Sequence, residues 1–504
     1  MSLAVVKSRA KLGIDAPEVS VEVHLSNGLP AFNIVGLPET SVKESKDRVR
    51  SAIINSYFEF PARRITVNLA PADIPKEGSR FDLAIAIGIL AASKQIPLEH
   101  LDDYEFMSEL ALSGDMRSIE ALLPSAQACA ANGKQLIVAI ANANEAALVE
   151  SLCVLPANHL LEVSAHLHQR TLIQPWVTSV SHSQHAHPEL RDIIGQLHAK
   201  RAMEVAATGG HHLLLSGPPG TGKTMLASRL AGILPPLSNS EAMEVASIHS
   251  VAGKGLREHI WSRPFRAPHH TASAAALVGG GSTPKPGEIS LAHLGILFLD
   301  ELPEFSRSVL EVLREPLESG QILISRVAAQ TRYPASFQLV AAMNPCPCGY
   351  LGSKRCVCSL DQITRYQHKI SGPLLDRIDL QVQVLAIENQ QLLDQEVKLD
   401  GDSNEQIQGR VCKARKVQLR RQGKINAHLT SQELNQVCPL TQEQKALMDQ
   451  AIDRFGLSTR GFYRVLKVAR TLADLAEIKY PQLPQYQEAL SYRSTIDKRA
   501  EVNY

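Results

Sequence analysis

The sequence predicts an α/β protein of several domains that ends in a helical segment. Strand-like and helix-like stretches alternate over residues 1–165 and again over residues 191–385, which is typical of α/β folds. A glycine-rich segment, Gly217-Pro-Pro-Gly-Thr-Gly-Lys223-Thr224, stands between an apolar strand and a helix, as phosphate-binding loops do. From residue 386 onward the apolar pattern is helical only.

The composition agrees with several folded domains and excludes some classes of protein. The chain has 504 residues, 44% of them hydrophobic, which is enough for two to four cores. Its 52 basic and 51 acidic side chains exclude a histone-like protein but not a local basic patch. Because no stretch of 18 uncharged apolar residues and no secretory signal is visible, we expect a cytoplasmic protein without a membrane segment. The eight cysteines are too sparse for a disulfide scaffold.

The N-terminal stretch, residues 1–165, predicts one α/β domain. Alternating β-branched residues indicate strands at 21–25 and 64–69, and a short apolar run indicates another at 135–139. Residues 81–92 are apolar over a helical length. The following residues, 166–190, are rich in Ser, His and Gln and are interpreted as a linker.

The glycine-rich segment predicts a nucleotide site between a strand at residues 212–215 and a helix at 224–234. Glycines allow backbone N–H groups to turn inward around phosphate oxygens. We expect Lys223 to reach the β- and γ-phosphates of ATP and Thr224 to bind Mg²⁺. The whole loop is predicted to hold the nucleotide, and it comprises Gly217, Pro218, Pro219, Gly220, Thr221, Gly222, Lys223 and Thr224. The alternative is a structural glycine turn, which the strand–loop–helix context disfavours.

Two further strands end in polar side chains that suit the same site. Ile296-Leu-Phe-Leu-Asp300-Glu301 places two carboxylates at the carboxyl end of an apolar strand. Asp300 is predicted to hold Mg²⁺ and Glu301 to act as general base on the attacking water. The strand at residues 338–343 ends in Asn344, which is interpreted as a sensor of the γ-phosphate or an orienter of water. The alternative for Asn344 is an Asn-Pro turn.

These three elements, in this order, resemble the AAA+ ATPase module, and the surrounding sequence resembles its magnesium-chelatase-like branch. Within that branch the resemblance is to the bacterial YifB/ComM family, and it covers essentially the whole chain. The motifs that carry it are Gly217–Thr224, Arg263-Pro-Phe-Arg-Ala-Pro-His-His-Thr271, Pro286-Gly-Glu-Ile-Ser-Leu-Ala-His293, Asn344-Pro-Cys-Pro-Cys-Gly349, Ser371-Gly-Pro-Leu-Leu-Asp-Arg-Ile-Asp379 and Val468-Ala-Arg-Thr-Leu-Ala-Asp-Leu475. The resemblance implies an AAA+ core at residues 191–385, a helical lid at 386–504, and hexamers with ATP sites at subunit interfaces.

The resemblance gives roles to two arginines. Arg377 corresponds to the arginine finger that reaches the γ-phosphate of the neighbouring subunit. The alternative is a surface ion pair with Asp376 or Asp379. Arg460 corresponds to the second sensor, although Arg464 is a rival for that role.

The N-terminal domain resembles Lon-type proteases without their catalytic pair. Residues 76–88 resemble the helix that carries the Lon serine, and residues 109–133 the region that carries the Lon lysine. Arg80 stands where the serine should be, and Leu123 roughly where the lysine should be. Ser79 is one position away and has no lysine partner in the motif, so we expect a Lon-like fold without peptidase activity.

Four cysteines are spaced as metal ligands. Cys346-Pro-Cys348 and Cys356-Val-Cys358 form two C-x-C pairs on one loop, and four such thiolates close a tetrahedral Zn²⁺ site. The alternatives are reduced thiols or a redox pair. His269 and His270 are given a role facing polynucleotide or a subunit interface in preference to a metal.

Basic stretches suggest DNA as a partner. Residues 247–287 are long for a helix–strand connection, and they resemble the helix-2 insert that this branch of AAA+ proteins projects into the central pore. Residues 320–337 are predicted to form a hairpin before the third strand. Residues 410–424 carry seven basic side chains and no acidic one, although a solvated charged face is the alternative for each stretch. The candidate DNA contacts are Arg263, Arg266, Arg326 and Arg332.

Together these features predict a hexameric, ATP-driven motor that translocates on single-stranded and branched DNA. The resemblance implies a helicase that promotes branch migration during natural transformation and homologous recombination, with recombination proteins as further partners. The alternative is a remodeller of a partner protein, similar to the ATPase subunit of magnesium chelatase, and a third reading is a nucleotide-gated scaffold.

Overall fold

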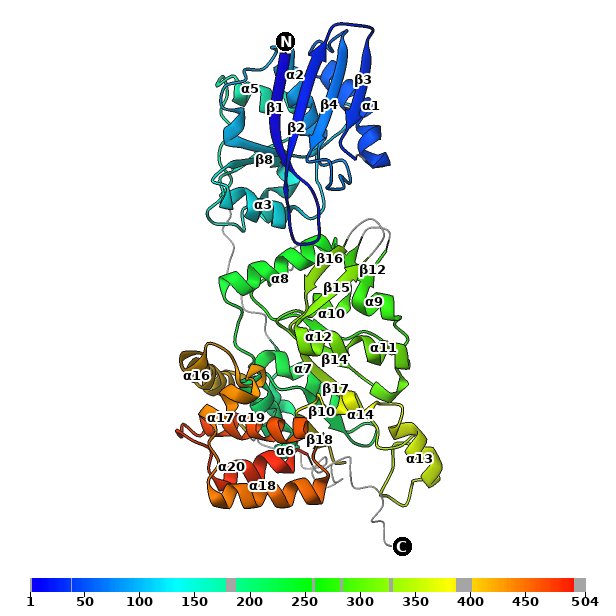
Figure 1. The fold of residues 1–504 in the computed structure, drawn as a ribbon, viewed down its shortest axis with the longest axis vertical. Helices are drawn as coiled ribbons and strands as arrows, with labels where there is room; N and C mark the ends of the chain where they lie inside the picture. The colour runs from blue at the N-terminus through cyan, green and yellow to red at the C-terminus, as the bar shows by residue number, and fades with distance from the viewer. Residues whose placement is uncertain are drawn as a thin grey trace.

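The structure, a computed structural model, describes residues 2–37, 39–177, 187–255, 259–281, 284–325, 330–386 and 401–493. An N-terminal α/β part lies at one end of the long axis, a parallel-sheet core follows, and the C-terminal helices lie beside that core (Figure 1). The predicted α/β fold class with a helical C-terminal segment is therefore confirmed. Among the described residues, no helix combines the length and the apolar character needed to cross a lipid bilayer.

The N-terminal part is built on a mixed seven-stranded sheet with the order β3-β4-β2-β1-β5-β8-β9. Its strands are β1 (Ser2–Arg9), β2 (Glu18–Ser26), β3 (Ala31–Val35), β4 (Arg64–Ala70), β5 (Tyr104–Met107), β8 (Gln135–Ala139) and β9 (Val154–Ala157). Its helices are α1 (Thr40–Asn55), α2 (Asp82–Ala92), α3 (Leu122–Ala131), α4 (Ala143–Ala146) and α5 (Leu160–Leu167), and a short ribbon pairs β6 (Glu109–Leu110) with β7 (Met116–Arg117). The three predicted strands and the helix at 81–92 are confirmed as β2, β4, β8 and α2.

Helix α2 forms the centre of this part because all of its residues are buried. Strand β2 alternates buried and half-buried side chains, as a strand with one covered face does. A Cβ atom at Gly88 of α2 would lie 2.5 Å from Cγ2 of Val23. Glycine at this position therefore allows the helix and the sheet to approach closely.

The side chains at the positions that the Lon resemblance singles out are engaged within the N-terminal part. Arg80 is only 3% exposed, and its guanidinium donates to the backbone oxygen of Glu120 at 2.6 Å and to Oγ of Ser125 at 3.3 Å. The Ser79 hydroxyl donates to the carboxylate of Glu109. Leu123 is fully buried in an apolar cluster that includes Ala246 of the core.

The core sheet is parallel throughout and has the order β11-β14-β17-β10-β18. Its strands are β11 (Phe265–Arg266), β14 (Ile296–Leu299), β17 (Gln338–Met343), β10 (Leu213–Ser216) and β18 (Leu380–Gln383). Strands β10, β14 and β17 are buried along their whole length, as strands covered by helices on both faces are. This order places the carboxyl ends of β14 and β17 beside the end of β10.

Two elements of the core differ from the sequence expectations. Residues 247–287, predicted as an insert, also contain β11, an edge strand of two residues that is too short to show a period. The sequence pattern predicts a helix over residues 192–208, and this helix begins at Leu197 instead because Gly195 and Gln196 adopt left-handed backbone angles. The hairpin predicted at residues 320–337 is confirmed, with β15 (Gln321–Ser325) antiparallel to β16 (Gln330–Pro334).

The remaining core elements surround the sheet, and the C-terminal helices pack on one side of it. In the core these are α6 (Leu197–Gly209), α7 (Lys223–Ile233), α8 (Asn239–Val251), α9 (Ala274–Val278), β12 (Gly279–Gly280), β13 (Lys285–Pro286), α10 (Glu288–Leu291), α11 (Arg307–Val312), α12 (Arg314–Ser319), α13 (Leu360–Gln367) and α14 (Gly372–Leu375). The C-terminal helices are α16 (Asn404–Gln422), α17 (Ser431–Val437), α18 (Gln442–Phe455), α19 (Thr459–Leu475) and α20 (Leu483–Ser491). Helices α16 and α19 share one apolar cluster with α6 and the sheet, so the C-terminal helices and the core have a continuous interior.

The N-terminal part contacts the core through α3, α4 and α8. Oγ of Ser247 donates to Oε1 of Gln127 at 2.9 Å, and Oγ of Ser250 donates to Oε1 of Glu145 at 2.5 Å. Lys285, beyond α9, lies 3.7 Å from the carboxylate of Glu120. The N-terminal part therefore rests on the segment that the sequence assigns to the helix-2 insert (Figure 1).

Candidate nucleotide site and cysteine cluster

The phosphate loop connects β10 to α7 in a backbone conformation that its glycines permit. Gly220 and Gly222 have φ angles of +76° and +85°, and α7 begins directly after them at Lys223. Nζ of Lys223 donates to the backbone oxygens of Gly217 and Pro218, both at 2.8 Å. The ammonium group is therefore held inside the loop, at the N-terminal end of a helix where anions bind well.

The electrostatics of Lys223 depend on two carboxylates that arrive from β14. Burial lowers the pKa of Lys223, and the negative charges of Asp300 and Glu301 oppose that shift. Oγ1 of Thr224 donates to Oδ2 of Asp300 at 2.6 Å. A hydroxyl and a carboxylate at this separation are a pair of oxygen ligands that Mg²⁺ accepts beside a phosphate loop.

Glu301 is held in a strained conformation beside a histidine. Its φ angle is +51°, which is uncommon for a residue other than glycine and occurs often at functional sites. Oε2 of Glu301 lies 3.2 Å from Nδ1 of His270, which comes from the loop after β11. The ring of His270 is tilted by 33° relative to that of His269, with centroids 4.1 Å apart. The contact of His270 with Glu301 was not predicted, because β11, the strand before this loop, is only two residues long and leaves no pattern in the sequence.

Asn344 joins the site from β17, the strand next to β10. Its Oδ1 accepts a hydrogen bond from Nζ of Lys223 at 3.1 Å. The amide is therefore close enough to contact a phosphate or a water molecule held by the loop. The structure thus brings together Lys223, Thr224, Asp300, Glu301 and Asn344 at one edge of the sheet.

The predicted arginine finger, Arg377, and the predicted second sensor, Arg460, lie near one carboxylate that is not part of the nucleotide site. The guanidinium of Arg377 is 5% exposed, donates to the backbone oxygen of Pro373 at 2.7 Å and pairs with Glu318 of α12. Arg460, at the start of α19, is 60% exposed and lies 3.6 Å from the same carboxylate. Asp376 and Asp379, the alternative partners for Arg377, form no ion pair with it among the residues that the structure describes. No feature of the sequence singled out Glu318.

Arg464, the rival of Arg460, belongs to a buried network between the core and α19. Its guanidinium donates to Oδ1 of Asp379 at 2.5 Å. Oδ2 of Asp379 accepts the backbone N–H of His212 at 3.0 Å and lies 3.6 Å from Nδ1 of His211. Burial alone would raise the pKa of Asp379, but Arg464 and the two histidines outweigh it and hold that pKa well below its usual range. Arg464 therefore ties the C-terminal helices to the sheet.

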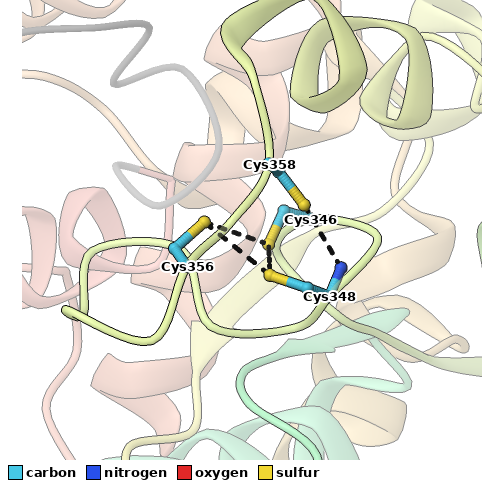
Figure 2. Close-up of side chains that lie close together, drawn as sticks. All are labelled: Cys346, Cys348, Cys356 and Cys358. Carbon is cyan, nitrogen blue, oxygen red and sulfur yellow. Dashed lines mark hydrogen bonds between the residues drawn. The ribbon is translucent and has the colours of Figure 1, made fainter.

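The four predicted metal ligands converge on one point (Figure 2). The sulfur atoms of Cys346, Cys348, Cys356 and Cys358 all lie within 4.8 Å of one another. Sγ of Cys348 is 3.4 Å from Sγ of Cys346 and 3.7 Å from Sγ of Cys356. A tetrahedral site with zinc–sulfur bonds of about 2.3 Å requires sulfur–sulfur separations of about 3.8 Å. The geometry and the donor set therefore fit Zn²⁺.

One thiol of the cluster is already favoured as a thiolate. The pKa of the Cys348 thiol is lowered to about 6, mainly because its sulfur accepts hydrogen bonds from the backbone N–H groups of Tyr350 and Val357. Hydrogen bonds from backbone N–H groups stabilise the charged form of a ligand in this way. Metal ligation requires that charged form.

The candidate DNA contacts lie in different environments. Arg263 is largely buried and donates to the backbone oxygens of Pro235 at 2.7 Å and Leu294 at 2.6 Å. Arg266 forms a bidentate pair with Glu288 at 2.6 and 2.8 Å. Arg332 is exposed on β16, and Arg326 lies outside the described residues.

The basic stretch at residues 410–424 is mostly paired within the chain. The partners of five of its seven basic side chains are Glu204 for Arg410, Glu477 for Lys413, the backbone of Ala207 for Arg415, Asp474 for Arg421 and Glu433 for Lys424. This stretch therefore offers less free positive charge than its composition suggests.

Three family models match the chain, and together they cover most of it. They are described as magnesium chelatase, subunit ChlI (residues 189–392), subunit ChlI of Mg-chelatase (residues 21–142) and magnesium chelatase, subunit ChlI C-terminal (residues 401–493). The competence protein ComM of Haemophilus influenzae is 51% identical over 503 residues, covering 98% of both chains. YifB of Escherichia coli, an uncharacterised protein, is 49% identical over 99% of this chain and 98% of its own. The magnesium-chelatase 38 kDa subunit of Acidiphilium rubrum is 27% identical over 30% of this chain and 51% of its own.

Proposed function

The chain belongs to the YifB/ComM family of magnesium-chelatase-like AAA+ proteins, and from this premise we propose that it is a hexameric, ATP-driven DNA motor. The motor translocates on single-stranded and branched DNA and promotes branch migration during natural transformation and homologous recombination. The observation that carries the proposal is the convergence of Lys223, Thr224, Asp300, Glu301 and Asn344 at the end of β10.

In the proposed reaction, each of these side chains has one task. Lys223 exchanges its backbone partners for the β- and γ-phosphate oxygens of ATP, while Thr224 and Asp300 supply oxygen ligands to Mg²⁺. Glu301 accepts a proton from the attacking water, and Asn344 orients that water. Bound Mg²⁺ supplies charge neutralisation on the phosphates. Arg377 and Arg460 face the nucleotide of a neighbouring subunit or of the same chain in the assembled ring.

Support for DNA as the substrate is less direct than support for ATP. Arg332 places an exposed guanidinium on the β15–β16 hairpin, and the Haemophilus influenzae relative is named a competence protein. The second candidate is a remodeller of a partner protein, and the internal pairing of Arg263 and Arg266 favours it. Its counterpart among the relatives is the magnesium-chelatase 38 kDa subunit.

One experiment separates the two candidates. ATP hydrolysis is measured alone, with forked DNA and with four-way DNA, and strand displacement is followed on the same substrates. The DNA motor requires stimulation by DNA together with displacement of a strand. A rate of ATP hydrolysis that is unchanged by DNA but increased by a protein partner supports the remodeller.

The cysteine cluster and the N-terminal part complete the proposal. The four cysteines hold one structural Zn²⁺ per chain, because their sulfur geometry closes a tetrahedron. The N-terminal part serves as a structural domain without peptidase activity, since Arg80 occupies the position of the Lon serine and Ser79 donates to Glu109. Degradation of an unfolded test protein such as casein by the purified chain would contradict the second statement.

A further inference from the structure

The cysteine loop, defined as residues 346–358, touches the phosphate loop at its first turn. Gly349 has a φ angle of +84°, and a Cβ atom there would lie 2.6 Å from Cδ and 3.2 Å from Cγ of Pro219. The backbone of the cysteine loop therefore packs directly against the proline ring of the phosphate loop. A side chain at position 349 would push the two loops apart.

A second contact joins the same two loops. Asn344 stands two residues before Cys346, and its Oδ1 accepts a hydrogen bond from Nζ of Lys223 at 3.1 Å. The backbone N–H of Gly349 donates to the oxygen of Cys346 at 2.9 Å and closes the turn between the first cysteine pair. Cys346 and Cys348 thus lie between two points, Asn344 and Gly349, that both contact the phosphate loop.

The second cysteine pair brings another segment to the same place. Cys358 is followed by Ser359, whose hydroxyl caps α13. Near the end of α13, Nε2 of Gln367 donates to the backbone oxygen of Pro345 at 3.2 Å. A metal ion held by all four sulfurs would link the end of β17 to the start of α13. Because the turn at Cys346–Cys348 is short, its shape depends on that link.

We propose that metal binding by the four cysteines and nucleotide binding by the phosphate loop are thermodynamically coupled through Gly349 and Asn344. This inference rests on the proposed nucleotide site and extends it to a second ligand. The metal orders the turn that presses on Pro219 and positions Asn344 against Lys223. Coupling between two binding sites is reciprocal, so bound nucleotide must strengthen metal binding by the same factor by which the metal strengthens nucleotide binding.

The test uses the full chain loaded with zinc. Zinc affinity is measured at equilibrium by competition with a chelator of known affinity, with and without saturating Mg–ADP. The affinity for a fluorescent ADP analogue is measured separately, with zinc present and after zinc removal. We expect each affinity to change by about fivefold or more, and the two factors to agree.

Two variants localise the coupling. Pro219→Ala removes the ring atoms nearest to Gly349, so both factors should fall below about twofold while one zinc per chain is retained. Leu351→Ala is the matched control, because this exposed side chain lies on the cysteine loop and is not among the atoms nearest to a Cβ at position 349. It should retain the coupling of the wild type.

The outcomes also distinguish this inference from the proposed function. Equal zinc affinities with and without Mg–ADP, in a protein that binds ADP and hydrolyses ATP, overturn the coupling and leave the ATPase intact. Protein that holds no zinc overturns it as well. Zinc-loaded protein that binds no ADP overturns both the coupling and the nucleotide site.

Discussion

Glu301 adopts an unfavourable backbone conformation that places its carboxylate at the nucleotide site. Its positive φ angle and its exposure to solvent leave the carboxylate facing outward from the end of β14. Lys223 has the opposite character, since it is buried and bound on several sides. Removing these two side chains should therefore affect different steps.

The first prediction compares the two residues. Glu301→Gln should retain ATP binding but reduce turnover by at least about a hundredfold, because the amide no longer accepts a proton. Lys223→Ala should lose nucleotide binding itself, since the phosphate loop loses its central cation. Binding of a fluorescent ATP analogue and steady-state hydrolysis measure the two effects. Turnover of Glu301→Gln within about tenfold of wild type would argue against its role as general base.

The sequence predicted some residues of the nucleotide site and its surroundings but not others. Lys223, Thr224, Asp300 and Asn344 follow apolar strands, so their positions at one sheet edge follow from strand order alone. His270 follows a strand of two residues that leaves no periodic signal. Glu318 is an ordinary helix residue whose partner, Arg377, lies 59 positions away along the chain. Long-range pairs of this kind have no local signature.

Helix α19 is joined to the parallel sheet by a buried ion pair in addition to apolar contacts. Arg464 of α19 reaches Asp379, which also accepts the backbone N–H that precedes β10. Burial lowers the pKa of neighbouring His212 to about 4, so this ring is neutral at physiological pH. The carboxylate of Asp379 thus connects α19 with the start of β10.

The second prediction concerns this connection. Asp379→Asn should destabilise the core by about 3 kcal/mol, because Arg464 loses its buried counter-charge. The folded pKa of Asp379 is depressed, so its contribution is present above the unfolded value of about 3.9 and is lost as pH falls below it. Thermal unfolding at pH 7 and at about pH 2.5 measures both effects, and the difference between wild type and variant should shrink at the acidic pH because it lies below the unfolded pKa of about 3.9.

Asp376→Asn is the matched control for that prediction. Asp376 lies on the same turn but accepts only a hydrogen bond of 3.3 Å from the Ser458 hydroxyl. Its loss should cost about 1 kcal/mol or less. Equal destabilisation by the two variants would show that the ion pair with Arg464 is not the cause.

The third prediction is that the cysteine cluster holds about one zinc per chain. Elemental analysis of protein purified without added metal gives the stoichiometry. Replacing Cys356 and Cys358 with serine should abolish zinc binding. Replacing Cys129, a buried cysteine of the N-terminal part that does not belong to the cluster, should leave zinc binding unchanged. A value near zero with four readily alkylated thiols would favour the reduced or redox interpretation.

The predicted arginine finger, Arg377, and the predicted second sensor, Arg460, both lie near a carboxylate of their own chain. Glu318 pairs with Arg377 and lies near Arg460. Glu318 is 55% exposed, whereas the Arg377 side chain is 5% exposed. If the proposed ring forms with ATP sites between subunits, Arg377 would have to exchange this carboxylate for a phosphate of a neighbouring subunit.

The fourth prediction tests whether that exchange occurs between subunits. Arg377→Ala should bind ATP normally and hydrolyse it at least about a hundredfold more slowly. Mixing it with Glu301→Gln protein should restore part of the activity, because some interfaces then combine an intact Arg377 with an intact Glu301. Hydrolysis is measured across mixing ratios. No recovery at any ratio would contradict a role in trans for independent sites.

The fifth prediction concerns the path of DNA. Arg332→Ala should weaken binding to DNA of any sequence and reduce the slope of log affinity against log salt by roughly one unit, as for one lost phosphate contact. Hydrolysis without DNA should be unchanged, since Arg332 lies on the hairpin outside the nucleotide site. Arg365→Ala, an exposed arginine on α13, is the control. If Arg365→Ala alters the slope and Arg332→Ala does not, the hairpin is not the contact surface.

Arg80 acts as an internal cross-link between segments that lie far apart along the chain. Its guanidinium donates to the backbone oxygens of Glu120, Ala121 and Arg9 as well as to Ser125. A short side chain at this position would leave buried carbonyl oxygens without donors and a void where the guanidinium had been. Serine at position 80 would therefore cost stability before it offered any new chemistry.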